Sequence, residues 1–152
     1  MKILSTKKSS KVFLGGTCNN STWRDRLIPM LKIDYFNPVV KNWTPECQAE
    51  EIKQRETCEV VLYCITPLMK GIYSIAEVVD DSNKRSEKTV LICLKEDDGE
   101  SFDKTQWKSI EQLMKMVKGN KAQIFTDLES AAKYINGLKY SMHIDFDENE
   151  EK

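Results

Sequence analysis

The chain has 152 residues, the length of one ordinary domain, so separate cofactor and substrate domains are not expected. Apolar residues make up 40% and charged residues 31% of the sequence, which indicates a globular protein rather than a disordered chain. The formal net charge of -1 removes the electrostatic reason to expect nucleic-acid binding by the whole surface.

The first half of the chain predicts two strands and two helices. Residues 11–15 form a short, continuously apolar run that ends at a pair of glycines, which is typical of a strand buried on both faces. A helix is expected over residues 23–31, where Pro29 either kinks it or makes it begin late. Residues 35–40 read as a second strand and its exit, and residues 45–55 as a second helix that begins with proline.

The second half continues the alternation of apolar strands and helices. The strongest strand signal, at residues 60–65, is stopped by Thr-Pro. The helix after it is expected to bury a stripe made of Ile72, Ile75, Ala76 and Val79. The remaining predicted elements are a strand at 89–94, a polar loop at 95–101, a helix over 107–119, a strand at 122–125 and a helix over 128–137.

Five short strands that alternate with helices indicate the α/β class with a doubly wound parallel sheet. We therefore expect a flavodoxin-like or Rossmann-like fold of three layers, α/β/α, over residues 11–138. Residues 1–10 are rich in Lys and Ser, and residues 139–152 end in a cluster of acidic side chains. Both segments are expected to be flexible termini.

The cysteines and the apolar runs indicate in which cellular compartment the protein is expected and whether a metal site is expected. No apolar run reaches the roughly 20 residues that cross a bilayer, and the apolar stretch at the start is too short for a signal peptide. The five cysteines form no Cys-x-x-Cys pair, and Cys64 and Cys93 lie within apolar runs, as core residues do in a reducing compartment. We expect a cytoplasmic protein with no cofactor, no metal and no membrane partner, and Asp80-Asp81 fits a solvated helix face better than a metal pair.

Ligands of an open parallel sheet bind beyond the carboxyl ends of its strands, near the point where the strand order reverses. The loops to search are residues 15–20, 37–44, 66–74 and 95–101. The first of these holds Gly15, Gly16 and Thr17, whose small side chains let backbone N–H groups approach a ligand. Two glycines after a strand are also typical of a simple tight turn, and neither a dinucleotide fingerprint nor a P-loop is present.

Two interpretations compete for Ser74 and Glu77, which are spaced as Ser-x-x-Glu at the start of a helix. In the structural one, the hydroxyl and the carboxylate form a capping box that satisfies backbone N–H groups. In the functional one, Glu77 is a carboxylate at the mouth of the sheet that can attack a sugar carbon. The helical wheel favours the capping box, since Glu77 lies nearly opposite the predicted apolar stripe.

Several segments in this order resemble nucleoside 2-deoxyribosyltransferases, most closely the small branch of that family that is common in phages and bacteria. They are VFLGGT at residues 12–17, WRD at 23–25, Asn37-Pro38, Trp43, EVVLY at 59–63, and Gly71-x-x-Ser74-x-x-Glu77. The resemblance extends from about Lys11 to Asn136.

The resemblance implies base exchange or hydrolysis at the N-glycosidic bond of a 2′-deoxynucleoside or its 5′-monophosphate. The matching glutamate, Glu77, attacks C1′ as the base leaves, and a second base or water then opens the glycosyl-enzyme ester from the opposite face. Gly15, Gly16 and Thr17 match the family's loop that faces the sugar and the base. Members of the family commonly complete the pocket from a neighbouring subunit, so a homo-oligomer (a dimer or higher) is expected.

Further substrate-binding candidates share positions in the searched loops or beside them: Asp25, Trp43, Glu51, Gly71, Tyr73 and Ser74. Trp43 and Tyr73 either stack on a base or pack at the end of the sheet. Ser74 either holds a 5′-phosphate or a sugar hydroxyl, or serves only as the N-cap of its helix.

The chain departs from the family where a proton donor is usual. Active relatives usually carry an acid at the position of Gly71, so the acid role falls to Glu50, Glu51 or Asp25, or is missing. A second hypothesis therefore keeps the pocket but drops the chemistry, which makes the protein a nucleotide sensor or sponge. Gly71 favours the sensor, whereas Glu77 in its motif favours the enzyme.

Overall fold

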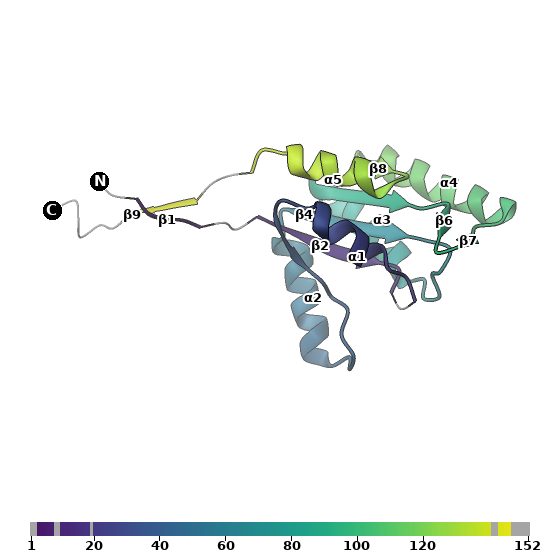
Figure 1. The fold of residues 1–152 in the computed structure, drawn as a ribbon, viewed down its shortest axis with the longest axis horizontal. Coiled ribbons are helices and arrows are strands. Elements are labelled where there is room, and N and C mark those ends of the chain that lie inside the picture. Colours follow the sequence, from purple (N-terminus) through teal and green to yellow (C-terminus); the bar gives the residue numbers. More distant parts are fainter. Residues whose placement is uncertain (1–2, 8–9, 19, 141–142, 147–152) are drawn as a thin grey trace.

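A five-stranded parallel sheet with helices on both faces forms the centre of the computed structural model (Figure 1). The structure describes residues 3–7, 10–18, 20–140 and 143–146. The sheet and its two helical layers confirm the predicted α/β, doubly wound, flavodoxin-like class.

The strand order explains where a ligand site is expected. The strands are β2 (Lys11–Gly16), β3 (Asp34–Phe36), β4 (Val60–Ile65), β5 (Thr89–Cys93) and β8 (Gln123–Phe125), and neighbours pair in parallel in the order β3-β2-β4-β5-β8. Since β3 follows β2 in the chain but lies on its outer side, the order reverses between β2 and β4. That reversal is the point at which flavodoxin-like sheets bind their ligands.

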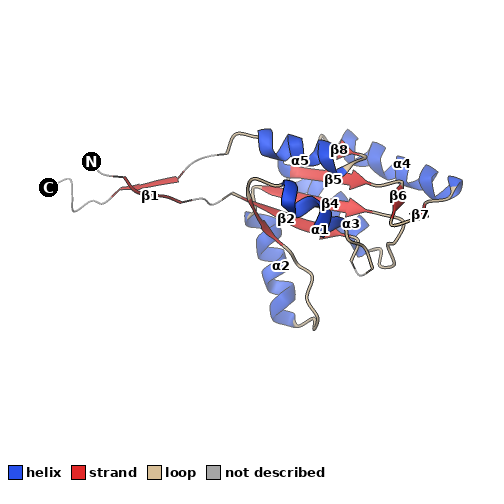
Figure 2. Ribbon diagram, viewed as in Figure 1, coloured by secondary structure: helices blue, strands red, loops and turns tan. Residues whose placement is uncertain are grey.

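Helices cover both faces of the sheet (Figure 2). Each face buries one set of alternating side chains. Val12 and Leu14 of β2 point into the core formed with α1 (Trp23–Leu27) and α5 (Leu128–Gly137). Phe13 points to the opposite core, formed with α3 (Tyr73–Lys84) and α4 (Lys104–Gly119). The three central strands are buried almost throughout because they are apolar on both faces.

The helix α2 (Pro45–Thr57) projects away from the rest of the described chain (Figure 1). Thr44 caps it by accepting from the backbone N–H of Cys47, and Pro45 occupies the first turn, as the sequence predicts. Gln54 is its only side chain classed as buried. A helix this polar is held by specific contacts rather than by an apolar face, and these contacts form part of the site described below.

Several element boundaries differ from the predicted ones. The helix α1 ends at Leu27, and Pro29 lies in a following 3-10 turn, Ile28–Met30, because proline cannot donate the next helical hydrogen bond. The strand β3 ends at Phe36, so residues 37–40 are loop. The predicted polar loop after β5 contains a small hairpin made of β6 (Glu96–Asp97) and β7 (Glu100–Ser101), and a second 3-10 turn, Ser86–Lys88, precedes β5.

The predicted apolar stripe of α3 is correct for Ile75 and Val79, which pack against the core beside β4 and β5, and wrong for Ile72 and Ala76, which are exposed. Ile72 is 73% exposed, whereas Glu77, Val78, Asp81 and Ser82 form the buried face. The capping box is also absent, since Ile72 is the N-cap residue and no side chain caps the helix. Asp81 is fully buried rather than solvated. The reason is that arginines and a tyrosine pair with these carboxylates, so the buried face looks polar in the sequence.

Parts of the two termini lie within the described residues. The strands β1 (Ile3–Lys7) and β9 (His143–Phe146) pair antiparallel in a two-stranded sheet of their own. Residues 1–2, 8–9, 141–142 and 147–152 lie outside the described residues, so the flexible termini and the domain limits at 11 and 138 stay predictions. None of the helices described is both long and apolar enough to cross a bilayer.

Candidate functional site

A cavity of about 240 Å³ lies beyond the carboxyl ends of β2 and β4, where the strand order reverses. Gly15 and Gly16 come from β2, Ser74 and Glu77 from the first turns of α3, and Glu51 from α2. Loop and helix residues complete the lining: Cys18, Arg24, Pro38, Val39, Val40 and Trp43. The cavity therefore brings together the glycine turn after β2, the start of α3 and the helix α2, which are far apart in the sequence.

The glycines leave bare backbone at the end of β2. Gly15 and Gly16 pair with Tyr63 and Cys64 of β4. Gly16 has a φ of +114°, a backbone angle that residues with a side chain rarely adopt. A Cβ at Gly16 would strike the backbone of Cys64, and one at Gly15 would lie 2.6 Å from the ring of Tyr63. Only glycine fits at both positions, so the packing of β2 against β4 and the positive φ of Gly16 explain both glycines.

Thr17 fastens this loop instead of lining the cavity. Its side chain is buried, and its hydroxyl accepts a hydrogen bond of 3.0 Å from the backbone N–H of Thr66. Its own N–H donates to the carbonyl of Cys64 at 2.8 Å. Thr17 thereby ties the loop after β2 to the end of β4.

Arg24 is a buried cation in the cavity wall. Its guanidinium donates to the carbonyl of Leu14 at 3.0 Å and to that of Thr17 at 2.7 Å, and it lies 4.4 Å from the ring centre of Trp23. Sequence reasoning used Arg24 only as part of a matching segment. The feature of the sequence that could have indicated a role for Arg24 at the cavity is its position next to Trp23, shortly after the glycine turn.

Glu77 and Glu51 form a pair of carboxyl groups at the cavity. Glu77 is 8% exposed. Burial, together with a hydrogen bond and the charge of Glu51, raises the pKa of Glu77 to about 8, while Arg55 opposes the increase. A hydrogen bond between two carboxyl groups needs a proton, so this contact favours the neutral form of Glu77.

Arg55 connects this pair to a buried charge cluster. Its Nη1 lies 3.5 Å from Oε2 of Glu77, and its Nη2 lies 3.0 Å from Oδ1 of Asp81. The hydroxyl of Tyr63 donates to Oδ2 of Asp81 at 2.5 Å, and Arg85 also pairs with Asp81. Burial raises the pKa of the Tyr63 hydroxyl, which keeps it a donor. These contacts fix α2 against α3.

The structure separates the other predicted residues into two groups. Ser74 and Trp43 line the cavity, and Trp43 remains 56% exposed. Three do not line it: Asp25, Gly71 and Tyr73, all of them exposed. Glu50, the alternative to Glu51, is exposed on α2 and accepts from the side chain of Gln54 at 2.7 Å. Of the three proposed acids, Glu51 alone lines the cavity.

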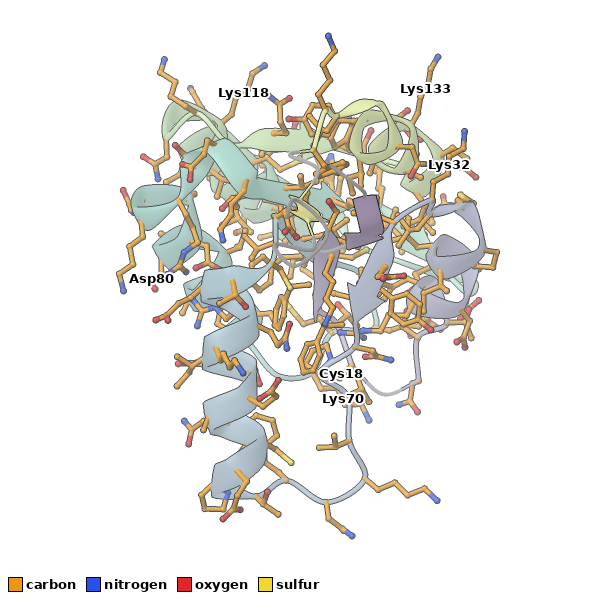
Figure 3. All side chains as sticks on the ribbon, turned by 90° about the vertical axis from the view of Figure 1, so that its left-hand side faces the viewer. Cys18, Lys32, Lys70, Asp80, Lys118 and Lys133 are labelled. Carbon is orange, nitrogen blue, oxygen red and sulfur yellow. The ribbon has the colours of Figure 1, made fainter. Side chains whose placement is uncertain are left out.

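The loop before α2 contributes residues that sequence reasoning missed. Pro38, Val39 and Val40 line the cavity together with Trp43. Figure 3 shows this loop and α2 extending beyond the rest of the described chain, with Cys18 lying beside them. The resemblance at Asn37-Pro38 pointed to this loop without specifying its lining residues. Across the described part of the chain, no three His, Cys, Asp or Glu side chains cluster closely enough to hold a metal ion.

Comparison with known proteins gives one family match. Residues 9–97 match the family model described as "Nucleoside 2-deoxyribosyltransferase like", a stretch that is more than half of the chain and runs from β2 through β6. It includes every residue that lines the cavity. No curated protein matches the chain.

Proposed function

The chain belongs to the nucleoside 2-deoxyribosyltransferase-like family, and on that premise we propose that it breaks the N-glycosidic bond of a 2′-deoxynucleoside or its 5′-monophosphate. The deoxyribosyl group passes to a second base or to water. The observation that carries the proposal is that two carboxyl groups, Glu77 and Glu51, line one cavity near the strand-order reversal. We assign Glu77 as the nucleophile and Glu51 as the proton donor.

In the first step, a carboxylate oxygen of Glu77 forms a bond to C1′ of the sugar. The bond between C1′ and the base nitrogen breaks, and its electron pair leaves with the base. Glu51 gives a proton to that base, which leaves Glu51 as a carboxylate. The negative charge beneath C1′ stabilises the oxocarbenium-like transition state, and the product is a glycosyl ester on Glu77.

In the second step, an acceptor nitrogen or a water oxygen attacks C1′ from the face that the base has left. The ester bond breaks and restores the Glu77 carboxylate. The Glu51 carboxylate takes the proton of the acceptor, which restores the acid for the next cycle. Two displacements at one carbon retain its configuration.

The remaining cavity residues bind the substrate. The backbone at Gly15 and Gly16 faces the sugar and the base, and Trp43 stacks on the base. Ser74, in the first turn of α3, holds the 5′ end of the sugar or its phosphate. The roles predicted for Thr17, Asp25, Gly71 and Tyr73 are indirect, because these residues lie outside the lining.

The protein acts as a homo-oligomer whose neighbouring subunit covers the cavity rim. Of the eight large hydrophobic side chains that are exposed among the described residues, seven lie in or next to segments that line the cavity: Tyr35, Val39, Val40, Trp43, Ile52, Ile72 and Tyr73. Exposed apolar groups gathered in one region mark a surface that another protein covers.

Base exchange is tested by incubating the protein with each 2′-deoxynucleoside and 5′-monophosphate, with and without a second free base. Chromatography measures the released base and the new nucleoside. Glu77→Gln, which removes the nucleophile but keeps its size, is expected to lower turnover by at least about a thousandfold. Glu111→Gln on α4, an exposed glutamate outside the cavity, is the matched control and is expected to leave turnover unchanged.

The same experiment distinguishes the enzyme from the sensor. Mass spectrometry of the protein quenched in acid is expected to detect a deoxyribosyl adduct on the wild type and none on Glu77→Gln. Tight nucleotide binding without turnover, unaffected by Glu77→Gln, contradicts the proposed chemistry and supports a nucleotide sensor.

A further inference from the structure

Arg24 places a positive charge in the wall of the cavity without an anionic partner. The residue is 7% exposed, and it lines the cavity of about 240 Å³ together with Cys18 and Gly16. None of the ion pairs among the described residues involves Arg24. Asp25, next in the chain, is exposed and lies outside the lining, so water screens its charge. A buried charge in this setting is stabilised by any anion that enters the cavity.

The guanidinium bonds uncharged acceptors and keeps donors in reserve. Nε and Nη2 donate to the carbonyl of Leu14 at 3.2 and 3.0 Å, and Nη1 donates to that of Thr17 at 2.7 Å. An arginine has five N–H donors, so these bonds leave one on each terminal nitrogen. Cys18 is a further hydrogen-bond neighbour of the guanidinium, and a thiol is a weak acceptor. A phosphate oxygen is a much stronger one.

The guanidinium is also held in place by its surroundings. It lies 4.4 Å from the ring centre of Trp23, whose Nε1 donates at 2.7 Å to the same carbonyl of Thr17. A long side chain that is already ordered loses little conformational entropy when a ligand binds. Arg24 is therefore preorganised as an anion-binding group, which a flexible lysine on the surface is not.

We propose that the cavity selects a 2′-deoxynucleoside 5′-monophosphate over the nucleoside, and that Arg24 is the residue that determines this preference. The inference rests on the proposed function, which leaves the two substrates as alternatives. A phosphomonoester carries a charge of about −1.5 to −2 at pH 7 and three acceptor oxygens. The deoxyribose and the base are uncharged, so the phosphate is the part of the substrate that compensates the guanidinium.

The opposite charges reach the cavity from opposite faces of the sheet. The helix α1, which carries Arg24, packs on one face, and α3, which carries Glu77, packs on the other. Glu51 enters from α2, which is bonded to α3. A ligand with an anion at one end and an electrophilic carbon at the other fits this polarity. The phosphate is attracted by Arg24 and repelled by carboxylates, which directs C1′ towards Glu77.

The other polar groups of the cavity do not distinguish the two substrates in this way. Arg24 is the only cationic side chain among the described residues that line the cavity. The hydroxyl of Ser74 bonds a phosphate oxygen or a sugar hydroxyl alike. Arg55 lies outside the lining, and its guanidinium is taken up by Asp81 and Glu77.

The test compares kcat/KM for a 2′-deoxynucleoside 5′-monophosphate with kcat/KM for the matching nucleoside. For the wild type we expect the ratio of these constants to be at least about ten, and for Arg24→Gln we expect it to fall to about one. Arg24→Lys keeps the charge and is expected to keep the ratio within about threefold of the wild type. A purely structural role of Arg24 lowers both constants together and leaves their ratio unchanged.

Lys118→Gln is the matched control. It removes one positive charge from an exposed position of α4 outside the lining, at the opposite end of the molecule from Cys18 in Figure 3. The ratio is expected to equal that of the wild type. An equal fall in Lys118→Gln makes net charge the cause and overturns the inference. An unchanged ratio in folded Arg24→Gln overturns it too, and so does a wild type that uses both substrates equally well.

A second measurement does not depend on turnover. Calorimetry with Glu77→Gln, which keeps the cavity but lacks the proposed nucleophile, gives the Kd of the monophosphate, of the nucleoside and of inorganic phosphate. The monophosphate is expected to bind at least about tenfold more tightly than the nucleoside, and this difference is expected to vanish when Arg24→Gln is added. Equal affinities contradict the inference even where turnover is normal. A wild type without turnover that still prefers the monophosphate contradicts the proposed function alone.

Discussion

The two carboxyl groups at the cavity differ in how the fold holds them. Glu77 is in a helix packed on the sheet, and its charge is countered by Arg55. Glu51 is on the projecting helix α2, and the structure gives it no cation among the ion pairs of the described residues. In the proposed mechanism, the nucleophile is therefore the carboxyl group that lies beside a cation, and the acid is the one without such a partner among the ion pairs of the described residues.

The first prediction concerns Glu51, the proposed acid. Glu51→Gln is expected to lower kcat by about a hundredfold or more, because no side chain then protonates the leaving base. The pKa of Glu77 is expected to fall at the same time, since the neighbouring carboxyl raises it. The measurement is kcat against pH for a natural deoxynucleoside and for a deoxyriboside with a nitrophenol leaving group, which needs no protonation.

Glu50→Gln is the matched control for this prediction. Glu50 neighbours Glu51 on α2 but is exposed and bonds Gln54, so its change is expected to leave the rate and the pH profile intact. The nitrophenol substrate is expected to recover most of the loss in Glu51→Gln. A loss in Glu51→Gln that is equally large with the nitrophenol substrate rules out Glu51 as the donor.

Among the structural elements, the end of β2 is the least tolerant of change. Gly16→Ala is expected to lower the free energy of unfolding by about 3 kcal/mol, because alanine is strained at a φ of +114° and its Cβ strikes the backbone of Cys64. Urea unfolding followed by fluorescence measures the change. Gly137→Ala, in the last turn of α5, is the control, since its Cβ meets no atom within 4 Å and alanine favours helix.

A loss of stability in Gly16→Ala no larger than in Gly137→Ala contradicts this account of the turn. A folded Gly16→Ala variant with normal nucleotide binding shows equally that the bare backbone is not needed by the ligand. The same experiment thus distinguishes the structural explanation of Gly16 from the binding one, which the sequence left open.

How far the sequence predicted each element depended on whether its signal was local. The strands β4 and β5 were predicted closely, because a strand buried on both faces is an apolar run. The buried face of α3 was not, because Asp81 is buried by Tyr63 and Arg55, which are 18 and 26 positions away. No local pattern marks a carboxylate whose partners lie on other elements.

The candidate site, like the fold, was predicted in part from the sequence. The rule of strand-order reversal and the matching segments pointed to Gly15, Gly16, Ser74 and Glu77, all of which line one cavity. The choice among Glu50, Glu51 and Asp25 needed the orientation of α2. That orientation depends on the bonds of Arg55 to α3, and nothing in the composition of α2 indicates them.

On the scale of the whole molecule, the exposed apolar side chains are distributed unevenly. Of the eight described ones, three line the cavity (Val39, Val40 and Trp43), and four lie within a few positions of lining residues in the sequence (Tyr35, Ile52, Ile72 and Tyr73). The remaining one, Met116, lies on α4. Ile52 follows Glu51 in the chain and Ile72 precedes α3, so both lie beside the site without lining it. A subunit that covers this region would bury them and supply the missing wall of an open cavity.

The final prediction is that Ile52→Glu and Ile72→Glu dissociate the oligomer. A charge placed in an apolar interface is costly to bury, so light scattering after size-exclusion chromatography is expected to detect a smaller species than for the wild type. Met116→Glu adds the same charge on α4 and is expected to keep the wild-type mass. Turnover per chain is expected to fall upon dilution of the wild type as subunits separate, and to be low at all concentrations in Ile52→Glu and Ile72→Glu. A wild type that remains monomeric at high concentration, with full turnover, shows instead that one chain forms the whole site.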